Sequence, residues 1–171
     1  NPKISIKISP DHTKNQSNNF TRLDVNNIYG LNRLALNDSL EGGLSLTYGS
    51  EFKRINKTNS RENLVFKIAN NTRLDENKDL PTNNQMGQKT SNFFGEISYD
   101  PNEFFTTKYN FSTKNNFNDI TYENFTVNLN LNKFETSFDY INENDKEDKI
   151  SYFKNELKYN FNDINNISFS T

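Results

Sequence analysis

The chain of 171 residues is long enough for one ordinary domain. Its hydrophobic fraction is 32%, below the roughly 45–50% of globular domains, a range that also counts glycine. Aromatic residues nevertheless make up 13%, which argues against simple disorder because disordered chains are poor in them. The net charge of −2 gives no basic face for nucleic acid, and the absence of cysteine excludes disulfide bonds and thiolate metal sites.

The sequence contains no run near the roughly 20 apolar residues of a membrane helix, and no signal peptide. Strands of a membrane barrel give a much weaker signal per segment, so a barrel stays open. The chain begins with Asn1 rather than Met, and Thr171 interrupts an alternating run. We therefore expect a piece of a longer protein.

Alternating apolar residues predict about nine β-strands along the chain, and helical periodicity is hard to find. The predicted strands lie around 4–8, 40–48, 64–68, 93–99, 105–111, 120–131, 134–140 and 150–161, and from 167 onwards. Long polar connections at 10–38, 75–91 and 142–149 alternate with tight ones at 100–102, 132–133 and 162–165. This order predicts an up-and-down antiparallel sheet with long loops mostly at one rim and tight turns at the other.

The clearest alternation, F-T-V-N-L-N-L, begins at Phe125 and places apolar side chains on one face and hydroxyls and amides on the other. A soluble β-sandwich buries the apolar face, whereas an outer-membrane barrel turns it to lipid and encloses a polar lumen. The alternation of short turns with long loops, and the very polar second face, favour the barrel. We therefore predict an all-β, up-and-down antiparallel transmembrane β-barrel, present in part.

Two strands change parity partway along. Ile120 and Tyr122 lie out of step with the apolar positions after Phe125, and Ile150 and Tyr152 lie out of step with those after Leu157. A β-bulge would produce this change, as would a strand that runs past its buried zone into water.

The segment Asn27–Gly49 resembles the barrel of the LPS-assembly protein family LptD. The matching residues are Asn27, Asn32, Arg33, Asp38, Glu41, Gly43, Tyr48 and Gly49. A second segment resembles a strand and turn of the same family through Lys89, Ser91, Gly95, Tyr99, Pro101 and Asn102. The chain departs from the family pattern at Leu36, Ser39 and Ser45, which puts any fixed lumenal ion-pair network in doubt.

The resemblance implies transport rather than enzyme chemistry, with no cofactor. Family members form a barrel of about 26 strands behind a periplasmic jellyroll, and a plug lipoprotein, LptE, fills the lumen. Periplasmic bridge proteins deliver lipopolysaccharide (LPS), which leaves laterally into the outer leaflet of the outer membrane. Residues 1–171 would then be part of a single outer-membrane barrel domain, incomplete at both ends. A porin or other outer-membrane channel, and a soluble all-β binding module, are the alternatives.

This interpretation predicts which side chains face which environment. The residues expected to face lipid are Tyr109, Phe111, Val127, Leu129, Leu157 and Tyr159. The residues expected to face the lumen are Asn110, Thr126, Asn128, Asn130 and Lys158. Pro101 and Asn102 are expected in a periplasmic turn, and the long connections are expected outside the cell.

The matched segment also supplies candidates for a rim or lumen site: Asn32, Arg33, Asp38, Glu41, Gly43, Tyr48 and Gly49. Arg33 has Asp38 and Glu41 as possible partners, either in an ordinary salt-bridged loop or in a network that holds the long loop inward. Asp75–Asp79 imitates a calcium loop, but Leu80 stands where the turn requires glycine and Met86 where the bidentate Glu belongs. His12 is the one histidine, and nothing near it supplies the rest of a hydrolase or metal site.

Overall fold

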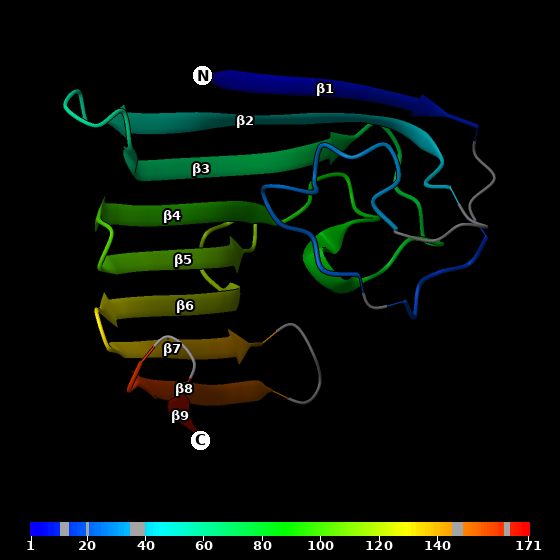
Figure 1. Ribbon diagram of the computed structural model, residues 1–171. Coiled ribbons are helices and arrows are strands. Elements are labelled where there is room, and N and C mark those ends of the chain that lie inside the picture. Colours follow the sequence, from blue (N-terminus) through cyan, green and yellow to red (C-terminus); the bar gives the residue numbers. More distant parts are fainter. Residues whose placement is uncertain (11–13, 20, 35–39, 145–148, 163–164) are drawn as a thin grey trace. The chain divides into compact units, whose positions relative to one another are not determined.

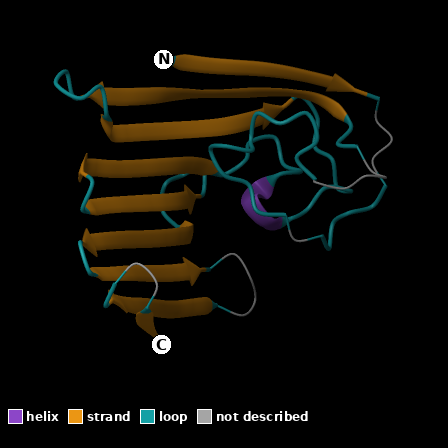
Figure 2. Cartoon of the chain, viewed as in Figure 1, coloured by secondary structure: helices purple, strands orange, loops and turns teal. Residues whose placement is uncertain are grey.

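The computed structural model describes residues 1–10, 14–19, 21–34, 40–144, 149–162 and 165–171 (Figure 1). Its strands are β1 (Pro2–Ser9), β2 (Gly43–Ile55), β3 (Glu62–Arg73), β4 (Phe93–Asn102), β5 (Phe105–Thr113), β6 (Ile120–Leu131), β7 (Phe134–Glu143), β8 (Ile150–Asn160) and β9 (Asn166–Ser170). The helical content of these ranges is one short 3-10 turn, η1 (Asn83–Gln85), drawn in purple in Figure 2. Among the described residues, no helix is long and apolar enough to cross a membrane.

The nine strands form one sheet in which each strand neighbours the next one along the chain, from β1 to β9. The printed registers of β1–β2, β6–β7, β7–β8 and β8–β9 are antiparallel. The predicted all-β, up-and-down antiparallel fold is therefore confirmed. Within the described ranges β1 and β9 are the two edges of this sheet, which is open, as expected for part of a barrel.

Tight connections close the hairpins through local asparagine chemistry. The Oδ1 atom of Asn102 accepts hydrogen bonds from the backbone N–H groups of Phe104 and Phe105, both at 2.9 Å. Asn132 turns the β6–β7 hairpin with a φ of 56°, in the left-handed region that asparagine tolerates better than most residues. Asparagine thus stabilises these turns, by accepting backbone hydrogen bonds or by adopting a positive φ.

The chain divides into two compact units, and several strands contribute to both. Unit 1 comprises Asn1–Glu51, Lys67–Gly95 and Phe111–Thr121. Unit 2 comprises Phe52–Phe66, Glu96–Asn110 and Tyr122–Thr171. The long connections before β2 and β4 belong to unit 1, and most of the tight hairpin turns belong to unit 2.

In unit 1, residues 21–34 and 75–92 form a compact layer, here called the loop cover, at one end of β2 and β3 (Figure 1). The side-chain amides of Asn83 and Asn84 both donate to the carbonyl oxygen of Thr21, at 2.7 and 2.9 Å, and so join the two segments. The cover and the sheet share a small apolar core: Leu23, Val25, Ile28, Leu34, Ala69, Leu80, Met86 and Phe94. These connections are therefore packed elements over much of their length.

The sheet of unit 1 has the reverse of the polarity of a soluble protein. In β2, Ser45 and Thr47 are 3% and 5% exposed, whereas Leu44 and Leu46 are 39% and 40% exposed. The register places Leu44, Leu46 and Tyr48 opposite the isoleucines of β1, which are exposed as well. Polar side chains thus lie inward under the loop cover, and apolar ones lie outward.

In unit 2, the register of β6, β7 and β8 sorts side chains into rows across the strands. The apolar face carries these rows: Leu131, Phe134 and Tyr159; Leu129, Thr136 and Leu157; Val127, Phe138 and Asn155; Phe125, Tyr140 and Phe153. The polar face carries these: Asn130, Glu135 and Lys158; Asn128, Ser137 and Glu156; Thr126, Asp139 and Lys154. Aromatic residues gather in the first and the last of the apolar rows.

On the N-terminal side of Phe125, polar residues occupy the apolar face and apolar residues occupy the polar face. The next row on the apolar face is Glu123, Asn142 and Ser151, whereas Ile141 and Tyr152 pair on the otherwise polar face. Pairing runs without interruption from Tyr122 to Leu131 and from Ile150 to Tyr159, so no β-bulge produces the change in these stretches. Of the two explanations offered by the sequence, the bulge is therefore wrong there, and the strands carry apolar residues onto the other face.

Candidate functional site

The most densely bonded group of side chains lies in unit 1 around the carboxylate of Glu41. Arg33 Nε donates to Glu41 Oε2 at 2.7 Å, and Arg33 Nη2 donates to Glu41 Oε1, which makes a bidentate pair. Arg73 Nη1 donates to Glu41 Oε1 at 2.5 Å, and Lys7 Nζ donates to Glu41 Oε2 at 3.0 Å. The side chains of Glu41, Arg33 and Arg73 are 0%, 1% and 2% exposed, so this Glu41 cluster is buried.

The cluster ties four parts of unit 1 together. Arg33 comes from the loop cover, Lys7 from β1, Arg73 from the end of β3, and Glu41 from the segment that leads into β2. Burial by itself raises the pKa of Glu41, but the hydrogen bonds and charges of Arg33 and Lys7 outweigh it and hold that pKa below its ordinary value. Glu41 is therefore ionised at neutral pH and acts as the common anchor.

Two glycines make room for this arrangement. Gly43 has a φ of +91°, and a Cβ built there would lie 2.8 Å from Arg73 Nη2, which donates to the carbonyl oxygen of Gly42. At Gly49, a Cβ would collide with the hydroxyl of Tyr29 and with the backbone of β3. Glycine at these two positions thus lets the loop cover and a buried guanidinium approach the sheet closely.

The structure brings together some of the residues that the sequence singled out. Arg33, Glu41 and Gly43 meet in the cluster, and Glu41 is the described partner of Arg33 of the two carboxylates considered. Asn32 is exposed beside the cluster and accepts from the N–H of Leu34, and Tyr48 lies on the opposite, apolar face. Asp38, Leu36, Ser39 and His12 lie outside the described residues.

Sequence reasoning missed two members of the cluster, Lys7 and Arg73. Lys7 is a polar residue of an alternating strand, and Arg73 lies beyond the strand predicted around 64–68. Both meet Glu41 only through contacts 32 to 34 residues apart in sequence. No short sequence pattern predicts contacts between residues so far apart in the chain.

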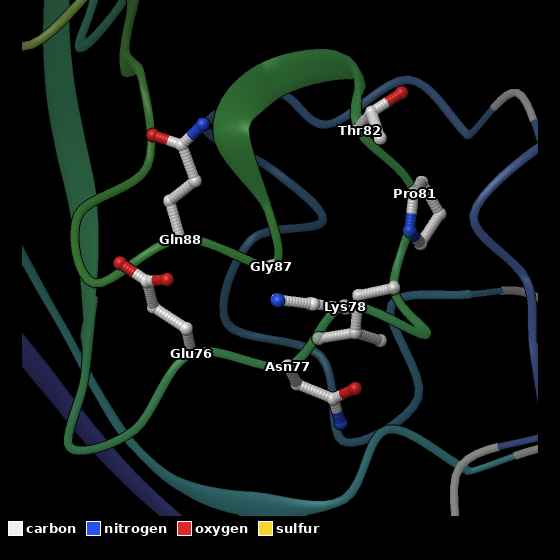
Figure 3. A pocket seen from close by; sticks show the side chains of 8 residues that line it. Glu76, Asn77, Lys78, Pro81, Thr82, Gly87 and Gln88 are labelled. Atoms are coloured by element: carbon white, nitrogen blue, oxygen red, sulfur yellow. The ribbon is translucent and has the colours of Figure 1, made fainter.

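A pocket of about 240 Å³ lies within the second segment of the loop cover (Figure 3). Its lining combines Glu76, Lys78, Gln88 and the backbone around Gly87. The part of the chain that the structure describes holds no group of three or more acidic, histidine or cysteine side chains placed to bind a metal. The pocket therefore lacks a metal site of that kind.

The polar face of unit 2 is a network of paired side chains. Thr126 donates to Asp139 at 2.6 Å, Asn110 donates to Asn124 at 3.4 Å, and Asn128 donates to Thr106 at 3.3 Å. Lys158 lies 3.5 Å from Glu135, in the row that also contains Asn130. Charges of opposite sign thus neutralise each other along this face.

The apolar side chains share the other face. The register places Val127, Leu129, Leu157 and Tyr159 on this face. The hydroxyl of Tyr109 donates to Glu123, which belongs to the same face, at 3.0 Å. In unit 1, the ring of Phe111 lies over Gly95 so closely that a Cβ there would collide with it. The sorting of side chains into two faces is thus as the sequence indicated, and what each face meets is a separate question.

An antiparallel sheet with exposed apolar bands, aromatic rows and a networked polar face has the features of an outer-membrane transport barrel wall. The sequence matches the LptD family, described as LPS transport system D, over residues 1–171. The chain therefore belongs to the LptD family, which serves lipopolysaccharide transport and is an outer-membrane family rather than an enzyme family. Neither the curated proteins nor the solved structures that were compared with the chain give a match.

Proposed function

We propose that residues 1–171 form an arc in the wall of the C-terminal outer-membrane barrel of an LptD protein, within a single barrel domain completed by further strands. The observation that carries this proposal is the reversed polarity of the sheet, in which Ser45 and Thr47 are buried while Leu44, Leu46 and Tyr48 are exposed. A soluble binding module would expose a large apolar area to water, whereas a barrel wall covers it with lipid.

In this proposal the apolar faces of both units meet lipid and the polar faces meet the lumen. The apolar rows of unit 2 extend from Phe125 to Leu131, about 20 Å along the strand at a rise of about 3.3 Å per residue. Barrel walls have an apolar band about 25 Å tall between aromatic girdles. Because barrel strands tilt by about 35–45°, this band is roughly 15 Å tall, shorter than that of a typical wall. The aromatic rows at its two ends have the composition of those girdles.

The mechanism is passive guidance of an amphipathic lipid into the outer leaflet. The polar face solvates the sugars and phosphates of lipopolysaccharide, the acyl chains leave laterally into the membrane, and bridge proteins in the periplasm deliver the cargo. The plug lipoprotein LptE occupies the lumen, and the loop cover closes the part of it next to unit 1. Family membership favours this role over that of a porin.

Single cysteines in the full-length protein test the assignment of faces. Cysteines at Thr126 and Asn128 should react with a membrane-impermeant thiol reagent in intact outer membranes, and cysteines at Val127 and Leu129 should be protected. These neighbours share one strand, so each is the other's control. The opposite pattern of labelling would overturn the assignment.

A second experiment tests transport. Depletion of the protein should remove lipopolysaccharide from the cell surface, and the barrel should need detergent for extraction and migrate differently in SDS before and after heating. Normal surface display after depletion, or recovery of the protein without detergent, would contradict the proposal.

A further inference from the structure

The connection between β5 and β6, residues 114–119, contains an aromatic residue in an unusual backbone conformation (Figure 1). Phe117 has a φ of 58°, in the left-handed region that bulky side chains rarely adopt. The other described residues with a positive φ, glycine apart, are all polar: Ser60, Asn84, Gln85 and Asn132. Phe117 is the exception among them, and such an exception needs a physical reason.

Hydrogen bonds within the connection hold Phe117 in this conformation. The N–H of Phe117 donates to the carbonyl oxygen of Lys114 at 2.9 Å, and the N–H of Lys114 donates to that of Asp119 at 3.0 Å. The side chains of Lys114 and Asp119 also form an ion pair, at 3.0 Å. Asn116 Oδ1 accepts from the N–H of Asn118 at 3.2 Å. The connection is therefore a closed turn in which the backbone is fixed on both sides of Phe117.

The ring of Phe117 stacks on a residue of the apolar face of unit 1. Its centroid lies 4.5 Å from that of Phe93, and the two ring planes are inclined by 27°. Phe93 shares an apolar surface with Ile4 of β1 and Tyr48 of β2, both of which are exposed. The connection thus folds back onto the outward face of the sheet, and its one apolar side chain lies there.

Stacking on Phe93 does not by itself account for the strained backbone. Phe117 remains 61% exposed, so Phe93 covers only part of its ring. A bulky residue at a positive φ costs about as much free energy as one aromatic pair returns. In water, asparagine would fit such a turn with less strain, as it does at Asn132. Phenylalanine becomes favourable here when the exposed part of its ring also has apolar surroundings.

The rest of the connection indicates what those surroundings are. The ring is flanked by Asn115, Asn116 and Asn118, and the pair of Lys114 with Asp119 closes the turn. A protein partner that buried the ring would also have to remove these polar groups from water. Lipid headgroups and interfacial water can bind them instead. An aromatic ring among polar neighbours therefore matches the boundary between headgroups and hydrocarbon, where aromatic side chains of barrels gather.

We propose that Phe117 is an interfacial anchor whose ring inserts among membrane acyl chains just below the lipid headgroups. This role rests on the proposed function, because it takes the apolar face of unit 1 to lie against lipid. It adds a membrane contact made by a connection between strands, which holds residues 114–119 against the outer surface of the wall and away from the lumen.

Tryptophan fluorescence can locate position 117, since residues 1–171 contain no tryptophan. The full-length protein with Phe117→Trp is placed in phosphatidylcholine vesicles, and the spectrum of the unaltered protein is subtracted. The emission should lie at a shorter wavelength than in water. A doxyl quencher near the lipid headgroup should quench it more strongly than a doxyl quencher at the end of the acyl chain.

Asn118→Trp is the matched control, because Asn118 is the next residue of the same turn and is exposed. Its emission should lie at a longer wavelength, and iodide in the water should quench it more strongly than either lipid quencher. The two variants differ by one position, so a difference between them reports the direction in which the turn holds each side chain.

Phe117→Asn distinguishes an anchor from a ring that only packs on Phe93. Asparagine tolerates a positive φ, so relief of strain should offset the lost ring pair if the rest of the ring lies in water. If that part of the ring lies in lipid, the lost contact is not offset. The urea concentration at which the barrel unfolds in the vesicles should then be lower than for the unaltered protein.

Equal emission and quenching of Phe117→Trp and Asn118→Trp would overturn the proposal, as would an unchanged or higher urea midpoint for Phe117→Asn. The cysteine pattern from Thr126 to Leu129 separates this failure from that of the proposed function. If that pattern is as expected while Phe117→Trp reports water, the anchor alone is refuted. The opposite cysteine pattern would refute the proposed function.

Discussion

Units 1 and 2 share one sequence pattern but use their polar faces differently. In unit 1 the polar face is covered by loops, and its charged groups are buried around Glu41. In unit 2 the polar face carries half-exposed pairs such as Lys158 with Glu135. Alternation determines which side chains share a face, whereas the length and apolar content of the connections determine whether that face is covered.

The two units should also differ in the energetic cost of removing a charged side chain. Buried ion pairs are strongly coupled to their surroundings, because removal of one partner leaves uncompensated charge in a region of low dielectric. Exposed pairs contribute about 0–1 kcal/mol since water and salt screen them. Changes to charges in unit 1 should therefore have large effects, and similar changes in unit 2 should have small ones.

The largest effect is expected from Glu41→Gln. This change leaves Arg33, Arg73 and Lys7 without their shared carboxylate, and we expect a loss on the order of 3–5 kcal/mol in the stability of the loop cover. The barrel should still assemble, because the hairpins of unit 2 do not depend on the cluster. Proteolysis of the cover and entry of large antibiotics into cells measure the result.

The charge-exchanged pair Arg33→Glu with Glu41→Arg sharpens this test. It should restore part of the barrier to antibiotics that Arg33→Glu alone destroys. If Arg33→Glu leaves proteolysis and permeability unchanged, the cluster does not hold the cover.

An intermediate effect is expected from Gly43→Ala. A side chain at a φ of +91° is strained by about 1–3 kcal/mol, and its Cβ would also press on the guanidinium of Arg73. Faster proteolysis of the loop cover should report the change. Gly30→Ala controls for the φ strain, since Gly30 lies in the cover outside the described positive-φ positions, although its Cβ would also lie 3.0 Å from the carbonyl oxygen of Asn27. An effect of Gly30→Ala as large as that of Gly43→Ala would show that crowding, rather than φ strain, limits the cover.

The Glu41 cluster should also depend on pH. Because the folded state lowers the pKa of Glu41, its contribution is fully present above the ordinary glutamate value of about 4.3 and is lost as pH falls through the lower folded pKa. Proteolysis of the cover should accelerate below about pH 4.3. Glu41→Gln should remove this acid-induced step, and a step that persists in that variant must arise from other groups.

The smallest effect is expected from Glu135→Gln in unit 2. Its pair with Lys158 is about two-fifths exposed on each side, so the loss should stay below about 1 kcal/mol. Thermal migration in SDS should be nearly unchanged. A loss as large as that of Glu41→Gln would remove the distinction between the two units.

Strand order and the sorting of faces could be predicted because they depend on short-range alternation and turn chemistry. The residues from Phe125 to Tyr140 show this, since the alternation of apolar and polar residues there predicts the face of each side chain. The loop cover could not be predicted in the same way. Leu23, Val25 and Met86 are isolated in polar stretches, and they form a core only because Asn83 and Asn84 bring distant segments together.

The candidate site likewise combines contacts that one sequence segment suggests with contacts that only the folded sheet creates. Arg33 and Glu41 are eight residues apart, within reach of inference from one segment, whereas Lys7 and Arg73 reach Glu41 only from other strands. The location of the long connections outside the cell stays a prediction, and in unit 1 parts of these connections are buried. An inserted epitope should be tolerated at exposed Asp75 or Glu76 rather than near buried Leu80 or Met86.

The exchange of polarity beyond Phe125 has a consequence for how the wall sits in a bilayer. A strand with a uniform pattern could slide along its own axis by two residues and still present the correct faces. Here such a slide toward the membrane would carry the Glu123, Asn142 and Ser151 row into hydrocarbon and lift an aromatic row into water. On the proposed assignment of faces, the exchange of polarity would therefore fix the depth at which these strands lie in the bilayer.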